Sequence, residues 1–232
     1  MRIILASASP RRQELLKRIT EDFEIKTADV DEVAIEKKLE ASGGYGNETE
    51  LAVRTVRELS IAKAMAVFEA LGYPVDTLII GADTVVALEN EILGKPKDRG
   101  DAVRMLRAQS LEPQRVVTGV TLILRNAEDV STGCCSCCGA QANSCIDFQN
   151  SIDISTRIRT FTEETLVYFK PLDEAQEQRI QEYCNTDEPY DKAGAYGIRL
   201  NGGSLVDRYE GDYDNIVGFP VKKVANEMSS FF

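Results

Sequence analysis

The chain alternates short aliphatic runs with longer segments in which apolar residues return every three or four positions. The run at residues 3–5 predicts a buried strand. A turn of small residues follows, and Pro10 favours the first turn of a helix that carries Leu15 and Leu16 on one face. Helical spacing over residues 48–71 predicts a second, much longer helix. Strands that alternate with helices are typical of an α/β protein.

Turn-forming residues divide the rest of the pattern. Residues 23–28 predict a strand that leads into an acidic loop at Asp31 and Glu32, and residues 41–47 predict a flexible loop. Residues 74–88 predict a pair of strands interrupted at 81–84, because glycine and aspartate are unfavourable inside strands. Further along, the pattern predicts helices over residues 101–108, 173–183 and 221–228 and strands over residues 116–124 and 152–159.

Composition narrows the function classes. The 232 residues include 27 Lys and Arg against 38 Asp and Glu, which gives a net charge of −11 and argues against nucleic-acid and membrane-surface binding. There is no histidine, so Ser-His-Asp triads, Cys-His pairs and His-ligated metals are excluded. Acid–base chemistry must then come from carboxylates, Lys, Tyr or Cys, and any metal is expected to be an oxygen-bound ion such as Mg²⁺ or Mn²⁺.

The length fits one large domain or two small lobes. No apolar stretch approaches the ~20 residues of a membrane span, and the N-terminus does not have the pattern of a signal peptide. We therefore expect a cytoplasmic protein with reduced cysteines.

The turn at residues 7–12 is the first candidate for chemistry. A strand that feeds small residues into a helix start presents unpaired N–H groups, with Ser9 as a suitable N-cap, and Arg11 and Arg12 add bidentate phosphate donors. This pattern predicts a phosphate cradle. An ordinary capped helix with two surface arginines has the same local sequence and stays an alternative.

Asp83 and Thr84 form the second candidate. Aspartate is depleted within strands, so Asp83 at a strand end or bulge between apolar runs suggests a metal ligand or a general base. A turn-forming aspartate is the alternative.

Two further segments carry weaker signals. Lys95, which follows a hairpin-like turn, either reaches a phosphate or is solvated. Small residues over 191–199 permit close backbone approach to a ligand, and Tyr196 offers a stacking face for a base. An irregular loop is the alternative for that segment.

Residues 126–150 have the composition of an insertion, with five cysteines between Cys134 and Cys145. A structural zinc site usually uses two separated cysteine pairs, and this run is more compact than that. We expect a Cys-rich surface loop, with a zinc site as the alternative.

Taken together, these segments resemble the Maf family of nucleoside triphosphate pyrophosphatases. The resemblance covers nearly the whole chain except residues 126–150 and the loop near Gly43. It runs through the motifs at residues 5–12, 81–86, 93–96, 191–198, 211–213 and 217–220, and through Lys63 in the long helix. The 191–197 segment is similar to the subgroup that hydrolyses dTTP and UTP.

The resemblance implies a single domain of two lobes, built on a mixed, curved sheet flanked by helices, with a nucleotide-binding cleft between the lobes. It implies cleavage of a nucleoside triphosphate to the monophosphate and pyrophosphate with Mg²⁺ or Mn²⁺, in cleaning of the nucleotide pool or in cell-division arrest. A homodimer is among the assemblies expected.

The resemblance also assigns residues. Asp83 is the catalytic residue and, with Glu32, a metal ligand. The substrate-binding residues are Ser9, Arg11, Arg12, Lys63, Thr84, Lys95, Lys192 and Arg199. Arg199 stands where dTTP/UTP-type enzymes usually have glutamine; since arginine only donates hydrogen bonds, base preference is open.

Three hypotheses follow. The first is a pyrimidine nucleoside triphosphate pyrophosphatase. The second is a nucleotide-binding regulator of cell division with weak or no turnover, against which the intact Asp83, Lys95 and Lys192 argue. The third is a metal- or redox-sensing module built on the cysteine run.

Overall fold

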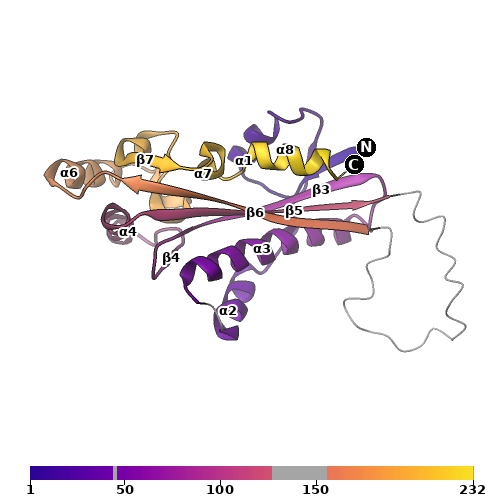
Figure 1. Cartoon of the computed structure of the whole chain (residues 1–232), viewed down its shortest axis with the longest axis horizontal. Coiled ribbons are helices and arrows are strands. Elements are labelled where there is room, and N and C mark those ends of the chain that lie inside the picture. Colours follow the sequence, from indigo (N-terminus) through magenta and orange to yellow (C-terminus); the bar gives the residue numbers. More distant parts are fainter. Residues whose placement is uncertain (44–45, 127–155, 232) are drawn as a thin grey trace, which may run out of the picture.

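The computed structural model describes residues 1–43, 46–126 and 156–231 and is built on a seven-stranded mixed sheet (Figure 1). The strands follow the order β2-β1-β3-β5-β6-β7, and β4 also pairs with β3. β1 is parallel to β2 and β3, and all other pairs are antiparallel. The strands are β1 (Arg2–Leu5), β2 (Glu24–Ile25), β3 (Thr77–Ala87), β4 (Ile92–Leu93), β5 (Gln114–Arg125), β6 (Thr156–Phe169) and β7 (Val206–Glu210).

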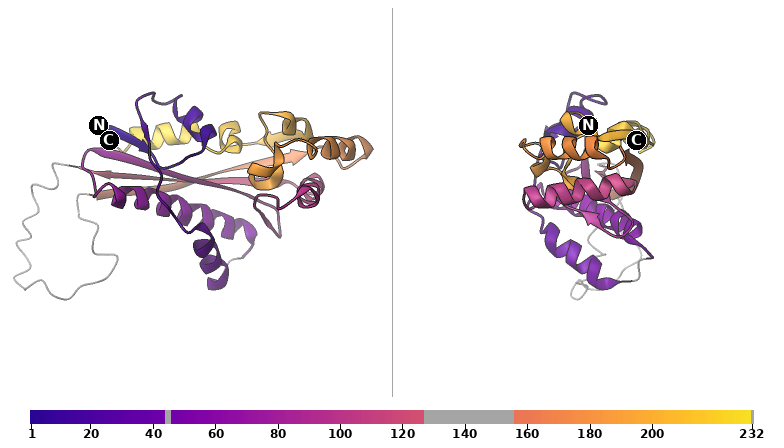
Figure 2. Two further views of the ribbon diagram at one scale, coloured as in Figure 1. Left: turned by 180° about the vertical axis from the view of Figure 1, so that it is seen from behind. Right: turned by 90° about the vertical axis from the view of Figure 1, so that its left-hand side faces the viewer.

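Helices cover both faces of this sheet, which confirms the predicted α/β class. α2 and α3 lie below the sheet in Figure 1, whereas α1, α7 and α8 lie above it; Figure 2 shows the same layers from behind and from one end. α4 and α6 pack against each other near the far end of the long strands. The helices are α1 (Pro10–Leu16), α2 (Glu32–Ser42), α3 (Glu48–Ala70), α4 (Arg99–Leu111), α6 (Glu174–Tyr183), α7 (Tyr213–Val217) and α8 (Val221–Ser229).

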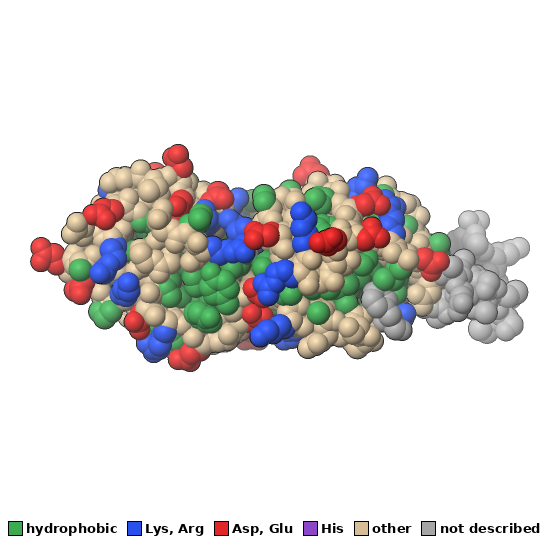
Figure 3. Space-filling view, turned by 90° about the horizontal axis from the view of Figure 1, so that it is seen from above, with side chains coloured by type: hydrophobic (Ala, Val, Ile, Leu, Met, Phe, Trp, Pro, Cys, Tyr) green, Lys and Arg blue, Asp and Glu red, His purple; other side chains and the backbone are tan. Residues whose placement is uncertain are grey.

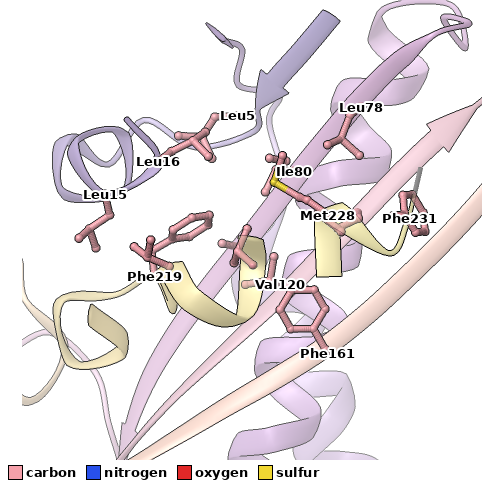
Figure 4. Packing of buried hydrophobic residues seen from close by; sticks show 14 of the residues in the cluster. Leu5, Leu15, Leu16, Leu78, Ile80, Val120, Phe161, Phe219, Met228 and Phe231 are labelled. Atoms are coloured by element: carbon pink, nitrogen blue, oxygen red, sulfur yellow. The ribbon is translucent and has the colours of Figure 1, made fainter. Parts of the chain in front are cut away.

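One apolar cluster lies between the sheet and the helices α1 and α8 (Figure 4). Ile80 and Val120 point from β3 and β5 toward Leu16, Phe219 and Met228, and all five are buried. Each such side chain contributes roughly 1.5–3 kcal/mol relative to an exposed one. A second cluster joins α4 and α6 to the other end of the strands through Leu106, Val116, Phe169, Ile180 and Tyr196. The division of the chain into two lobes stays a prediction.

The predicted interruption at residues 81–84 is wrong, because β3 is one strand of 11 residues. Every residue from Thr77 to Ala87 has a partner in β5, and Asp83 lies opposite Gly119. A continuous ladder outweighs the local preference against glycine and aspartate. Asp83 therefore lies inside a strand, not at a strand end or bulge.

α2 was not predicted, and Glu32 is its first residue instead of part of a loop. The side chain of Asp31 caps this helix by accepting a hydrogen bond from the Ala34 amide at 2.9 Å. Of its residues only Leu39 is buried, so the helix leaves little apolar periodicity in the sequence. The short elements β7 and α7 were not predicted either.

Three other expectations meet the structure differently. Ser9 occupies the N-cap position of α1, but its side chain makes no capping hydrogen bond. The predicted helix that carries Leu15 and Leu16 ends at Leu16, so α1 is only seven residues long. The cysteine run and the insertion lie outside the described residues. No described helix is long and apolar enough to cross a membrane.

α3 lies unusually close to the two central strands, because glycine faces it from both. A Cβ on Gly81 would lie 2.3 Å from the Ser60 carbonyl oxygen and 2.8 Å from the Ala64 Cβ. A Cβ on Gly119 would lie 2.4 Å from the carbonyl oxygen of Val56. Both positions therefore require glycine because of the close approach of the helix backbone.

Gly81→Ala should lower the free energy of unfolding by roughly 1–3 kcal/mol, the usual cost of overpacking. The measurement is urea unfolding followed by circular dichroism. Gly94→Ala is the control, since nothing lies within 4 Å of an added Cβ there. A Gly81→Ala protein as stable as the parent would contradict the close packing of α3.

Candidate active site

A pocket of about 600 Å³ opens between α1 and the segment that follows Asp191. Basic side chains gather on the face that carries α1, α7 and α8, beside an area of hydrophobic side chains (Figure 3). Seven predicted site residues line the pocket: Ser9, Arg11, Arg12, Thr84, Lys95, Lys192 and Arg199. Its apolar lining is Val86, Val116, Ala193, Tyr196, Ile198, Leu200, Ile216 and Val217.

The pocket adjoins a gap in the pairing of β3. On the edge opposite β5, β1 pairs with β3 as far as Ile80, and β4 pairs only with Val86 and Ala87. In the described part of the chain, no strand fills the edge between these two partners. Buried backbone groups at such a gap need other hydrogen-bond partners.

Arg12 supplies one of these partners and joins three parts of the chain. Its Nη1 donates to the Ala82 carbonyl oxygen at 2.9 Å and its Nε donates to the Gly218 carbonyl oxygen at 3.0 Å. Its Nη2 donates to Thr84 Oγ1 at 3.0 Å, and Nη1 also donates to Ser7 Oγ at 3.3 Å. Burial lowers the pKa of the guanidinium, and the negative charge of Asp83 partly offsets this. Most donors of Arg12 are thus engaged within the protein, which differs from the free phosphate donor that the sequence suggested.

A second group of predicted residues lies on the opposite face of β3. Alternate residues of a strand point to opposite faces, so Asp83 points toward α3 whereas Thr84 lines the pocket. Lys63 of α3 donates to Asp83 Oδ1 at 2.6 Å and lies 2.9 Å from Glu32 Oε1. The side chains of Lys63 and Asp83 are only 17% and 11% exposed, so their charges are weakly screened.

Glu36 extends this acidic group and was missed by the sequence analysis. Burial raises its pKa, and the negative charges of Asp83, Glu32 and Glu40 raise it further. Glu36 stands one helical turn after Glu32, so the i, i+4 spacing would have revealed it once α2 was recognised.

Arg12 connects the two groups electrostatically. Burial lowers the pKa of its guanidinium, and the negative charges of Asp83 and Glu32 partly offset this, so Arg12 interacts with the cluster as well as with the pocket. The structure therefore divides the predicted site residues between a cationic pocket and a carboxylate–lysine cluster on the two faces of β3.

The two loop lysines are held near each other by the backbone. The Gly194 amide donates to the Gly94 carbonyl oxygen at 3.1 Å, and Gly194 adopts a φ of +72° that favours glycine. Lys192 donates to the Glu188 carbonyl oxygen at 2.5 Å and forms an ion pair with Asp191. Asp191 also lies 3.6 Å from Arg11, so it links the loop to α1.

Arg199 forms a two-point ion pair with Glu14 of α1. Nη1 and Nη2 donate to the two carboxylate oxygens at 2.7 and 2.8 Å. The hydrogen bond from Arg199 lowers the pKa of Glu14, and the carboxylate in turn raises the pKa of Arg199. Both residues line the pocket, and the sequence analysis identified only Arg199.

This arrangement suits a ligand that carries both anionic and apolar parts. Arginine and lysine side chains bind phosphate oxygens, and the apolar lining fits a flat ring. A carboxylate pair that converges on one cation is the kind of oxygen donor set that Mg²⁺ or Mn²⁺ accepts, although no described group of three or more acidic or cysteine side chains forms a metal cluster.

Comparisons with known proteins agree with the resemblance. A family model described as "Maf-like protein" matches residues 2–231. A protein of Thermosipho africanus is 38% identical over 226 residues, which cover 97% of this chain and 90% of the relative. A protein of Clostridium botulinum strain Kyoto is 39% identical, and the match covers 96% of this chain and 93% of the relative. A protein of Clostridioides difficile is 35% identical, and the match covers 100% of this chain and 96% of the relative. All three relatives are named dTTP/UTP pyrophosphatase.

Arg12→Lys should lower the free energy of unfolding by at least about 1.5 kcal/mol, because hydrogen bonds to charged groups are worth about 1.5–3 kcal/mol and one ammonium cannot replace the fork. Urea unfolding measures this. Arg11→Lys is the matched control and should cost less than about 1 kcal/mol, since its ion pair is long and exposed. Equal losses in the two variants would show that the hydrogen bonds of Arg12 do not stabilise the open edge.

Proposed function

The chain belongs to the family of Maf-like proteins, and we propose that it is a nucleoside triphosphate pyrophosphatase that acts on dTTP and UTP. The observation that carries this proposal is the cationic pocket at the open edge of β3, where the pocket residue Thr84 directly follows Asp83 of the Lys63–Asp83–Glu32 cluster in the strand. The names of the relatives support the same reaction and substrates.

In this proposal the triphosphate lies among Arg11, Lys95 and Lys192, and Ser9 donates a further hydrogen bond to it beside Thr84. From the pocket it extends across the open edge of β3, so that the α-phosphorus meets the face that carries Asp83. These fixed donors stabilise the charge that develops on the phosphate oxygens. Arg12 holds the pocket wall in place and keeps part of its charge available to the substrate.

Asp83 is the proposed general base. A water molecule attacks the α-phosphorus, Asp83 takes a proton from that water, and the bond between the α-phosphorus and the bridging oxygen breaks. The products are the nucleoside monophosphate and pyrophosphate. Lys63, at 2.6 Å from Asp83 Oδ1, fixes the carboxylate within the strand and keeps its position defined.

Asp83 and Glu32 are also the residues that would hold a divalent metal. They converge on the Lys63 ammonium at 2.6 and 2.9 Å, so their oxygens already share one cation. Magnesium commonly takes one or two carboxylates and completes its shell with substrate phosphates and water. When bound, the metal would neutralise charge on the triphosphate.

We propose that this chemistry takes place in the cytoplasm on free nucleotides, in a monomer or a homodimer, since a net charge of −11 disfavours nucleic acid as a partner. The regulator hypothesis has no observation in its favour. The presence of Asp83, Lys63 and Lys95 supports turnover instead.

Asp83→Asn should lower turnover by at least ~10²-fold, the lower range of what removal of a general base costs. The assay is pyrophosphate release from a panel of nucleoside triphosphates with Mg²⁺. Nucleotide affinity should be largely kept, because the cations of the pocket are unchanged. Asp207→Asn, an exposed aspartate paired with Arg208, is the control and should retain parental turnover. If no triphosphate releases pyrophosphate with the parent protein, the proposed function is wrong.

Arg199→Gln should change the choice among bases more than the chemistry, because Arg199 lies beside the apolar wall of the pocket. The ratio of kcat/KM for UTP to that for dCTP is expected to shift further than kcat for the best substrate. Equal losses on every nucleotide would instead place Arg199 on the triphosphate.

A further inference from the structure

Glu14 and Arg199 form an ion pair with a well-defined geometry that a contribution to protein stability does not explain. The two side chains are 61% and 35% exposed, and exposed ion pairs contribute little to stability. Yet both carboxylate oxygens are engaged at 2.7 and 2.8 Å by the two terminal nitrogens of the guanidinium. The pair joins α1 to the segment after Gly197, and both residues line the pocket.

The charge of the pair indicates which part of a nucleotide it meets. A carboxylate repels phosphate oxygens, and its bond to Arg199 also neutralises that cation. The pair is therefore less suited to the triphosphate than Arg11, whose ion pair with Asp191 is longer at 3.6 Å, or than Lys95 in the same pocket. Ile198 and Leu200, which flank Arg199 in the chain and also line the pocket, offer apolar surface to a ring.

The hydrogen-bonding capacity of the pair matches one edge of a base. The guanidinium has five N–H groups, of which two bind Glu14, so others remain to donate. Each carboxylate oxygen keeps a lone pair that can accept. Side by side, the pair thus offers one donor and one acceptor, whereas Arg199 alone offers only donors.

We infer that Glu14 is a specificity-determining residue: it accepts the N3–H of uracil or thymine while Arg199 donates to a neighbouring carbonyl oxygen of the base. This inference rests on the proposed function. It assigns to the ion pair, as one unit, the donor and acceptor that a single glutamine amide would supply.

The test compares UTP with 3-methyl-UTP, in which a methyl group replaces the N3 hydrogen. The variant is Glu14→Met, which keeps the length and helix propensity of the side chain but has no carboxylate acceptor. For the parent, kcat/KM for UTP should exceed that for 3-methyl-UTP strongly, because the methyl group leaves the carboxylate without its donor. In Glu14→Met this ratio should fall at least ~10-fold, mainly through the loss on UTP.

Glu24→Met is the matched control, since Glu24 forms a two-point pair with Arg2 that is also on the surface and does not line the pocket. It should leave the ratio unchanged. A Glu14→Met protein that loses activity equally on both nucleotides would overturn the inference and reduce Glu14 to a positioning residue for α1. A parent protein that releases no pyrophosphate from UTP would overturn the proposed function itself.

Discussion

The site depends on a backbone carbonyl that has no neighbouring strand. Ala82 lies in β3 where β1 has ended and β4 has not begun, and its oxygen is hydrogen-bonded by Arg12. A buried carbonyl without a partner would cost about 1–3 kcal/mol. The same guanidinium reaches Gly218 and Thr84, so one side chain holds α1, the central strand and the loop before α8 in fixed relation. The gap stays open because a side chain fills its hydrogen-bonding needs.

A second constraint, the close approach of α3, acts on the other face of β3. Gly81 and Gly119 remove side chains that would keep the helix away, and Lys63 then reaches Asp83 at 2.6 Å. Removing one partner of a largely buried ion pair leaves an uncompensated charge, which commonly costs 3–5 kcal/mol. Aspartate is rare inside strands, but Asp83 can lie in β3 because the two glycines let α3 come close enough for Lys63 to neutralise its charge.

Elements of this fold can be predicted where the sequence pattern of the element itself determines its structure, and not where partners from other elements determine it. The long helix α3 and the strand β5 were found because their apolar periods extend over many residues. β3 was divided wrongly, since its continuity comes from eleven pairs with β5 and not from its own composition. Seven of the predicted site residues line one pocket, but the division of the predicted set between the two faces of β3 was not foreseen. Glu14 and Glu36 escaped notice because their importance arises from partners contributed by other elements.

Four of the six cations of the site already have an acidic partner from the same chain. Asp191 lies against Arg11 and Lys192, Glu14 binds Arg199, and Glu32 and Asp83 share Lys63. A bound anion must therefore compete with carboxylates that are held in place, so a weakly charged anion gains little. A triphosphate contacts several cations at once and can outweigh each local partner, since the contacts act within a single molecule. In a protein of net charge −11, this internal pairing favours a polyphosphate over the smaller anions that surround it.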